Sequence, residues 1–183
     1  MSLKCSAYIG ASVDGFIARV DGSIDWLQKP EYASASTIGL SYDAFISTVD
    51  AVVMGRNSFE QVLTFENWPY EQTPVVVLTT RHLSLPHRLQ GKVTVEKGRP
   101  AEVVARLASD GMKHVYIDGG VTIQRFLQAG LIHEITITQL PVLLGNGRPL
   151  FGSLGIEVPL THLATTTSEK GCVQIRYQVI HEP

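Results

Sequence analysis

The chain has 183 residues, of which 44% are hydrophobic and 17% are charged, and its formal net charge is −2. These values are typical of a single globular domain, spanning 1–183, and they exclude the basic surface of a nucleic-acid-binding protein. No apolar stretch approaches the roughly 20 residues needed to cross a bilayer, and the chain starts without the features of a signal peptide. The two cysteines have no metal-binding spacing. We therefore expect a cytoplasmic protein that binds neither membranes nor metals.

The first fifty residues predict a strand, a loop and a helix. Residues 4–11 form the strand, and 12–30 read as a loop because they contain two Asp-Gly turn signals and a Lys-Pro pair. Apolar side chains then recur at helical spacing, which predicts an amphipathic helix over 37–48.

The rest of the chain alternates strands and helices and then changes its pattern. We expect strands at 51–54, 75–79, 92–95, 115–117 and 134–140, and helices at 58–63, 101–109 and 122–129. From residue 160 apolar and polar residues alternate, which is the period of a strand, and 169–171 form the turn of a terminal hairpin. This order predicts a three-layer α/β fold: a mixed, mostly parallel sheet with helices on both faces and a C-terminal antiparallel hairpin.

Three of the predicted strands end in polar or glycine-rich segments. These segments are Gly55-Arg56-Asn57-Ser58, Thr79-Thr80-Arg81 and Asp118-Gly119-Gly120, the last followed by Thr122. Ligands bind at the carboxyl ends of strands in open α/β sheets, where glycine lets a phosphate approach the backbone and arginine pairs with it. Each segment alone also fits a tight turn or a solvated charge. Together they favour a ligand that carries phosphate, although neither a Rossmann nor a Walker motif is present.

Five segments in order resemble one known family. They are SVDGFIARVDGSIDWL, VVMGRNSFE, VVVLTTR, YIDGGVTIQRFLQAGLIHEITI and PVLLGNGRPLF. The chain is similar to the dihydrofolate reductase superfamily, and more closely to the RibD C-terminal branch, the reductase domain of riboflavin biosynthesis. The resemblance implies a dihydrofolate reductase-like fold, NADPH as cofactor, reduction of a small heterocycle, and a homodimer.

The resemblance also assigns roles to the strand ends. It implies that Gly55, Arg56, Asn57 and Ser58 hold the pyrophosphate and reach toward the 2′-phosphate, and that Leu78, Thr79, Thr80 and Arg81 hold the adenosine side. Gly119, Gly120 and Val121 would cradle the pyrophosphate, with Thr122 beside them. Gly10, Ile17 and Ala18 would meet the nicotinamide.

The sequence departs from the family in two respects. Dihydrofolate reductases carry a carboxylate four residues before a helical phenylalanine; counting back from Phe45 gives Ser41, and Asp43 is turned by about 200°. The deaminase domain of the riboflavin enzyme is also missing from this chain. Three alternatives therefore stay open: a reductase of another small heterocycle, a dihydrofolate reductase with a displaced acid, and a dinucleotide-binding protein without catalysis.

The substrate side of the site is marked only by single residues. Asp25 is the candidate proton donor, although a carboxylate there also fits a turn or helix cap. Trp26, next to it, is placed to cover the cleft and exclude water. Phe45 and Thr138 are the other candidate substrate contacts.

Overall fold

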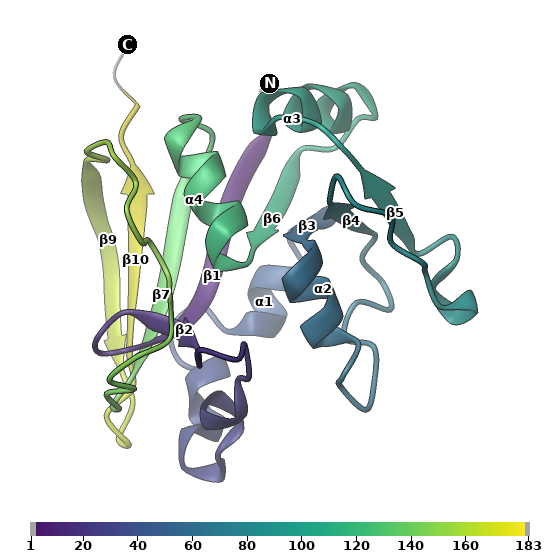
Figure 1. Cartoon of the computed structure of the whole chain (residues 1–183). Helices are drawn as coiled ribbons and strands as arrows, with labels where there is room; N and C mark the ends of the chain where they lie inside the picture. The colour runs from purple at the N-terminus through teal and green to yellow at the C-terminus, as the bar shows by residue number, and fades with distance from the viewer. Residues whose placement is uncertain (1–2, 182–183) are drawn as a thin grey trace.

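An eight-stranded sheet forms the centre of the computed structural model, which describes residues 3–181 (Figure 1). The strands follow the order β5-β4-β3-β6-β1-β7-β10-β9. Their bounds are β1 Lys4–Ser12, β3 Ala51–Gly55, β4 Val75–Leu78, β5 Val93–Glu96, β6 His114–Asp118, β7 Glu134–Leu140, β9 Leu160–Thr167 and β10 Val173–Val179. The strands from β5 to β7 in this order run parallel, whereas β10 is antiparallel to both β7 and β9. The predicted mostly parallel sheet with a C-terminal hairpin is confirmed.

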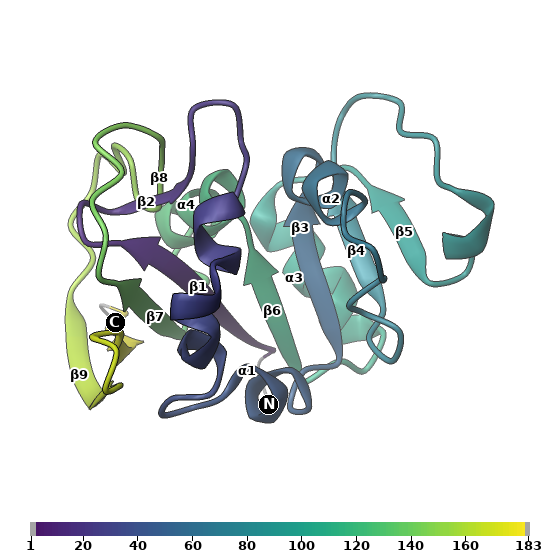
Figure 2. The same ribbon diagram turned by 90° about the horizontal axis from the view of Figure 1, so that it is seen from below.

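Helices cover both faces of the sheet (Figure 2). Their bounds are α1 Tyr42–Ile46, α2 Arg56–Val62, α3 Pro100–Ser109 and α4 Gly120–Gln128. On one face α3 and α4 bury Leu107 and Phe126, and on the other α1 and α2 bury Phe45 and Phe59. The inner strands β3 and β4 are covered on both sides, which explains why they are continuous apolar runs rich in valine. None of the helices in residues 3–181 is long and apolar enough to cross a membrane.

The segment before β3 differs from the predicted helix over 37–48. The α-helix is limited to Tyr42–Ile46 because Gly39 takes a left-handed φ of 55°, which breaks the helix on its N-terminal side. Ser41 then caps α1, its side chain accepting a hydrogen bond from the Ala44 N–H at 3.2 Å. Ile38 packs instead in a small cluster with Trp26.

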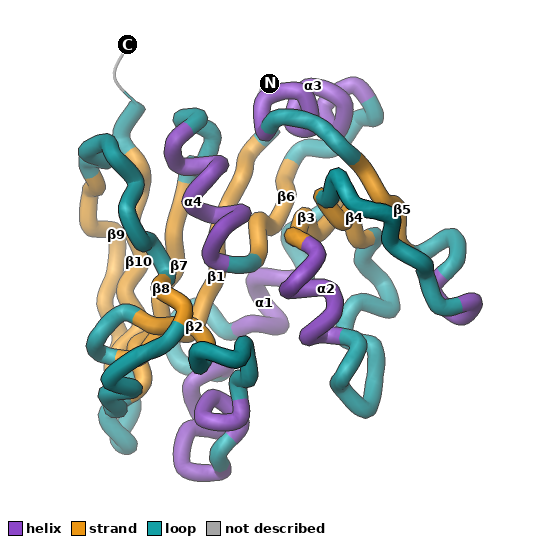
Figure 3. Tube along the Cα trace, in the orientation of Figure 1, coloured by secondary structure: helices purple, strands orange, loops and turns teal. Residues whose placement is uncertain are grey.

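The predicted loop over 12–30 is partly regular (Figure 3). It contains β2, Phe16–Ala18, which pairs with β8, Arg148–Pro149, in a separate two-stranded sheet, and a 3-10 helix, Asp25–Gln28. The Asp14 carboxylate supports this arrangement by accepting the backbone N–H groups of Leu144 at 3.1 Å and Gly145 at 2.8 Å. As a result, two segments far apart in sequence lie together at the start of α4.

Candidate active site

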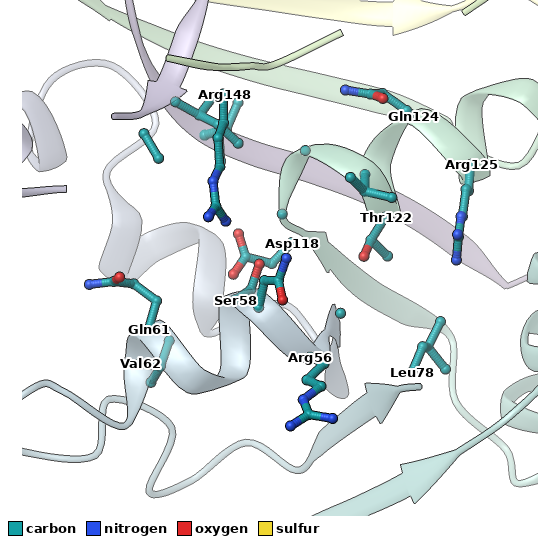
Figure 4. Close-up of a pocket in the computed structure, with 18 of the residues that line it drawn as sticks. Arg56, Ser58, Gln61, Val62, Leu78, Asp118, Thr122, Gln124, Arg125 and Arg148 are labelled. Atoms are coloured by element: carbon teal, nitrogen blue, oxygen red, sulfur yellow. The ribbon is translucent and has the colours of Figure 1, made fainter. Parts of the chain in front are cut away.

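A cleft of about 1130 Å³ crosses the carboxyl ends of the strands. Its lining comes from both faces of the sheet and from the β2–β8 segments (Figure 4). All residues predicted to bind the cofactor line this cleft: Gly10, Ile17, Ala18, Gly55, Arg56, Asn57, Ser58, Leu78, Thr79, Thr80, Arg81, Gly119, Gly120, Val121 and Thr122. The structure therefore brings the three strand ends together, as expected for an open parallel sheet. The role of each residue in binding stays a prediction.

Glycines shape the floor of the cleft at the β6–α4 turn. Gly119 has a φ of 90°, and a Cβ there would lie 2.2 Å from the Ser58 hydroxyl oxygen. A Cβ on Gly120 would lie 3.0 Å from the Pro149 carbonyl oxygen and 3.0 Å from the Ile17 Cδ1. No larger residue fits without a shift, so the backbone at the start of α4 stays open to the cleft. The first N–H groups of a helix lack partners within it, and they favour an anion at this point.

Basic side chains gather around the same floor. The cleft is lined by Arg56, Arg81, Lys97, Arg99, Arg125 and Arg148, whereas Asp118 is the only acidic residue in its lining within residues 3–181. Arg56 pairs with Glu60 at 2.6 Å and Arg99 with Glu102 at 2.8 Å. The other four make no salt bridge to a described residue. The cleft therefore has an excess of positive charge, which suits a ligand with several phosphates.

Asp118, the last residue of β6, places a partly buried carboxyl group in the middle of the cleft (Figure 4). Burial raises its pKa above the ordinary value, although hydrogen bonds from Tyr116 and from the Gly119 backbone act in the other direction. The Tyr116 hydroxyl lies 3.1 Å from Asp118 Oδ1 and 2.8 Å from the Tyr8 carbonyl oxygen. The single proton of that hydroxyl serves either of these two acceptors. Burial thus shifts the carboxyl group toward its neutral form, which is the form that is able to donate a proton.

Four tyrosines line the cleft on the α1–α2 face: Tyr8, Tyr42, Tyr70 and Tyr116. The rings of Tyr8 and Tyr42 meet edge to face with centroids 5.7 Å apart. Burial raises the pKa of Tyr42 to about 12 and raises the pKa values of Tyr70 and Tyr116 well above their usual range, so all three stay neutral at physiological pH. Val62 and Phe65 complete a wall that suits a flat, aromatic ligand.

The structure places Asp25 outside this cleft. Its side chain is 60% exposed and forms a two-point ion pair with Arg19, with distances of 2.6 Å and 3.1 Å. The hydrogen bonds from Arg19 lower the pKa of Asp25, so the carboxyl group is ionised where a donor needs a proton. The structure therefore does not bring Asp25 to the cleft, and the carboxyl group that does line the cleft is that of Asp118.

We expect Asp25→Asn to change the rate of the reduction that the family resemblance implies by less than about threefold, because an exposed ion pair contributes little and Asp25 is not part of the cleft lining. The measurement is NADPH oxidation with a saturating heterocycle between pH 5 and pH 9. A tenfold loss of rate, or a new ionisation in the pH profile, would return the acid role to Asp25.

The other three predicted substrate contacts also lie away from the cleft lining. Trp26 is 1% exposed and packs against Leu140 and Cys172, so it does not cover the cleft. Phe45 is buried below Tyr8, with stacked rings 4.9 Å apart. Thr138 is buried on β7, where its hydroxyl accepts a hydrogen bond from Gln174 at 3.3 Å. These three side chains are buried and do not line the cleft. Leu27, which follows Trp26, and Tyr42, which is on the same helix as Phe45, line it instead.

The sequence did contain a signal for Asp118. Along β6 the side chains alternate, with Val115 and Ile117 in the core beneath α3 and α4 and Tyr116 in the core beneath α1 and α2. Asp118 therefore lies on the side of Tyr116, facing the tyrosines rather than the helix that follows. No group of three or more His, Cys, Asp or Glu side chains suited to a metal occurs among residues 3–181.

Comparison with known proteins agrees with this geometry. Residues 5–177 match the RibD C-terminal domain. The Bacillus subtilis protein YwjB is 35% identical over 97% of this chain and 98% of its own. A crystal structure of a putative riboflavin biosynthesis protein from Shewanella sp. PV-4 superposes with a TM-score of 0.87 and 36% identity, covering 98% of this chain and 100% of that one.

A more distant structure shows the breadth of the fold. Dihydrofolate reductase from Enterococcus faecalis, complexed with NADP(H), superposes with a TM-score of 0.61 over 96% of each chain, at 14% identity. The likeness at this identity concerns the fold, and it confirms the expected dihydrofolate reductase-like architecture. With its full-length match and its shared fold, the chain belongs to the RibD C-terminal domain family.

Proposed function

We propose that this protein is an NADPH-dependent reductase of a small heterocycle, related to 5-amino-6-(5-phosphoribosylamino)uracil reductase of riboflavin biosynthesis. The observation that carries the proposal is that the cleft has two chemically different parts, one on each side of Asp118. Arg56, Leu78 and Arg125 lie on one side of this residue, and Gln61 and Val62 lie on the other (Figure 4). One side has the charge and open backbone for a dinucleotide, and the other has the flat apolar walls for a ring. The homodimer expected from the family is part of the same proposal.

The residues present fit NADPH. The glycine turn at Gly119 and Gly120 leaves space that a Cβ would fill, and the N–H groups at the start of α4 suit the pyrophosphate. Arg56 and Arg81 follow β3 and β4, and Arg81 has no salt bridge to a described residue, so its guanidinium is available for the 2′-phosphate. When bound, NADPH supplies a hydride to an unsaturated ring or imine carbon.

The chain itself contributes positioning, a dry surface and a proton. The tyrosine wall orients the ring of the substrate, and Leu27 and Phe65 limit the access of water. Asp118 then gives its proton to the nitrogen of the C=N bond whose carbon takes the hydride, and the resulting carboxylate regains a proton from solvent. This assignment balances the reaction, because a C=N bond becomes CH–NH by gain of one hydride and one proton.

One observation keeps dihydrofolate reduction as a second candidate. Ser41, the N-cap of α1, occupies the position of the usual acid, but Asp118 faces the same tyrosine-lined space from β6. A carboxyl group there is able to bind an amino-heterocycle. Oxidation of NADPH with dihydrofolate, compared with 5-amino-6-(5-phosphoribosylamino)uracil, separates the two reductases. Tight NADPH binding without turnover of either would indicate the third alternative, a dinucleotide-binding protein without catalysis.

Cofactor choice tests the proposal directly. We expect the wild type to bind NADPH at least tenfold more tightly than NADH, and we expect Arg56→Ala combined with Arg81→Ala to erase most of that difference. Hydrogen bonds to a charged group contribute about 1.5–3 kcal/mol each, or roughly tenfold to a hundredfold in affinity. The measurement is calorimetric titration of both cofactors into both proteins.

Arg88→Ala is the matched control, since Arg88 is an exposed arginine outside the cleft lining and its loss should leave both affinities unchanged. NADH binding by the double variant should stay within about threefold of wild type. A wild type that binds the two cofactors equally would remove the role proposed for these arginines.

A further inference from the structure

A buried amide connects the C-terminal hairpin to the segment that precedes α1. Gln174 lies on β10 and is 2% exposed. Its Oε1 accepts the Leu40 N–H at 2.8 Å, and its Nε2 lies 3.0 Å from the Leu40 carbonyl oxygen, 3.3 Å from the Tyr8 hydroxyl and 3.3 Å from Thr138 Oγ1. One side chain therefore pairs with both backbone groups of Leu40. Because unpaired polar groups are costly when buried, these bonds hold Leu40 against the sheet.

The turn before Leu40 is shaped to fit this amide. Gly39 has a φ of 55°, and a Cβ there would lie 2.5 Å from Gln174 Oε1. A larger residue would strain the backbone and displace the amide oxygen from the Leu40 N–H. The Gly39 turn and the Gln174 side chain thus form one unit, although they come from opposite ends of the sequence.

This unit fixes two of the tyrosines that line the cleft. The Tyr8 hydroxyl donates a hydrogen bond to the Leu40 carbonyl oxygen at 2.8 Å and lies within reach of the Gln174 amide. Leu40 is followed by Ser41, the N-cap of α1, and α1 begins with Tyr42, whose ring meets that of Tyr8 edge to face. Gln174 is not part of the cleft lining, so it acts on the tyrosine wall only through these neighbours.

We propose, on the basis of the reductase function above, that Gln174 is a positioning residue for the substrate. A flat ring stacks on the wall only while Tyr8 and Tyr42 keep their orientation, because contacts between aromatic rings depend on distance and angle. Gln174 sets the first through its phenol hydroxyl and the second through the start of α1. Among residues 3–181, its hydrogen bonds reach none of the residues predicted to hold the cofactor. Loss of the amide should therefore weaken substrate binding and spare cofactor binding.

The first variant removes the hydrogen bonds and keeps an unbranched side chain of similar length. Gln174→Met is saturated with NADP⁺, which allows binding without turnover, and is titrated with dihydrofolate and with 5-amino-6-(5-phosphoribosylamino)uracil. We expect the heterocycle that the wild type binds to bind the variant about tenfold or more weakly, while the Kd for NADP⁺ changes less than about threefold. Gln178→Met is the control on the same strand: Gln178 is exposed and outside the cleft lining, so both affinities should match wild type.

A second variant disturbs the same unit from the surface, where the risk to folding is smaller. Gly39→Ala places a methyl group against Gln174 Oε1, so it should also weaken heterocycle binding and spare NADP⁺. Its matched control is Gly130→Ala, since Gly130 has a similar φ of 65° but a Cβ there meets nothing within 4 Å. The two alanines add the same backbone strain, and only the first displaces the amide. If Gln174→Met does not fold, this comparison decides the question.

The outcomes separate this inference from the function on which it rests. A wild type that binds no NADP⁺, or binds NADP⁺ but neither heterocycle, refutes the reductase function and the inference with it. A wild type that binds both, together with folded Gln174→Met and Gly39→Ala variants that keep its heterocycle affinity, refutes only the role of Gln174. An equal loss of heterocycle and NADP⁺ affinity would also overturn that role, because it indicates damage to the whole fold.

Discussion

Replacing Asp118 by asparagine is expected to lower the rate of the reduction step by about 100-fold or more, the usual contribution of a positioned acid. Asparagine preserves the shape of the side chain and accepts the hydrogen bond from Tyr116, but it has no carboxyl proton to donate. The measurement is single-turnover oxidation of NADPH followed by absorbance. The wild-type rate should fall as pH rises through the raised pKa of Asp118, and the residual rate of the variant should lack that ionisation.

Stability should change in the opposite direction, which separates a catalytic role from damage to the fold. A raised pKa means that the folded protein holds the Asp118 proton more tightly than the unfolded chain. The stabilisation by this proton is complete below the unfolded pKa and is lost as pH rises through the folded pKa. Asparagine has no such proton to lose, so the stability of Asp118→Asn does not fall in this pH range. The variant should therefore unfold at a higher temperature than wild type at pH 8, and the difference between them should shrink at pH 4.

Asp110→Asn is the matched control for both measurements. Asp110 is exposed and follows α3 at the end of the sheet opposite the cleft, so the rate and its pH dependence should match wild type. The role assigned to Asp118 would be refuted by an Asp118→Asn variant that keeps the wild-type rate and its pH dependence.

Gly120→Val is expected to weaken NADPH binding by at least 100-fold. The Cβ of the new side chain would lie 3.0 Å from both the Pro149 carbonyl oxygen and Ile17 Cδ1, so the valine must either displace the β2–β8 segments or extend into the cleft. Both outcomes obstruct the backbone groups at the start of α4. Gly120 is preferable to Gly119 for this test, because Gly119 has a φ of 90° and its Cβ would overlap Ser58.

Ala129→Val provides the comparison, since it also ends in a valine side chain, here at the exposed far end of α4. Its NADPH affinity should equal that of wild type. Circular dichroism and thermal unfolding of both variants establish that they are folded. NADPH affinity within about threefold of wild type in folded Gly120→Val would show that the β6–α4 turn does not hold the cofactor.

The order of the elements was predictable because the inner strands are short, apolar and buried on both faces. Val75–Leu78 is an example: three successive valines lie between two helical layers, and no amphipathic helix has that pattern. The start of α1 was not predictable from the helical spacing of apolar residues alone. Ile38 has helical spacing from Tyr42, but the backbone turns at Gly39 and sends Ile38 to another cluster. A positive φ at one glycine overrode the apolar pattern.

The cofactor side of the site was more predictable than the substrate side. Gly55, Leu78 and Gly119 lie at strand ends, and parallel strands bring such residues together whatever the loops do. Trp26 and Leu27 show why the other side differs. In a 3-10 helix successive side chains diverge by about 120°, so one residue enters the core and the next lines the cleft. Sequence alone does not set that rotation, because it depends on packing against Leu140 from a distant strand.

The central place of β1 in the sheet has a consequence for the newly synthesised chain. Its two neighbours are β6, which begins at His114, and β7, which begins at Glu134. On the ribosome, β1 emerges before both of its partners, so both edges of this strand stay unpaired until the chain has been made as far as His114. An apolar strand with two open edges readily pairs with strands of other chains. Aggregation is therefore a hazard of the nascent polypeptide rather than of the finished protein, in which both edges of the same strand are paired.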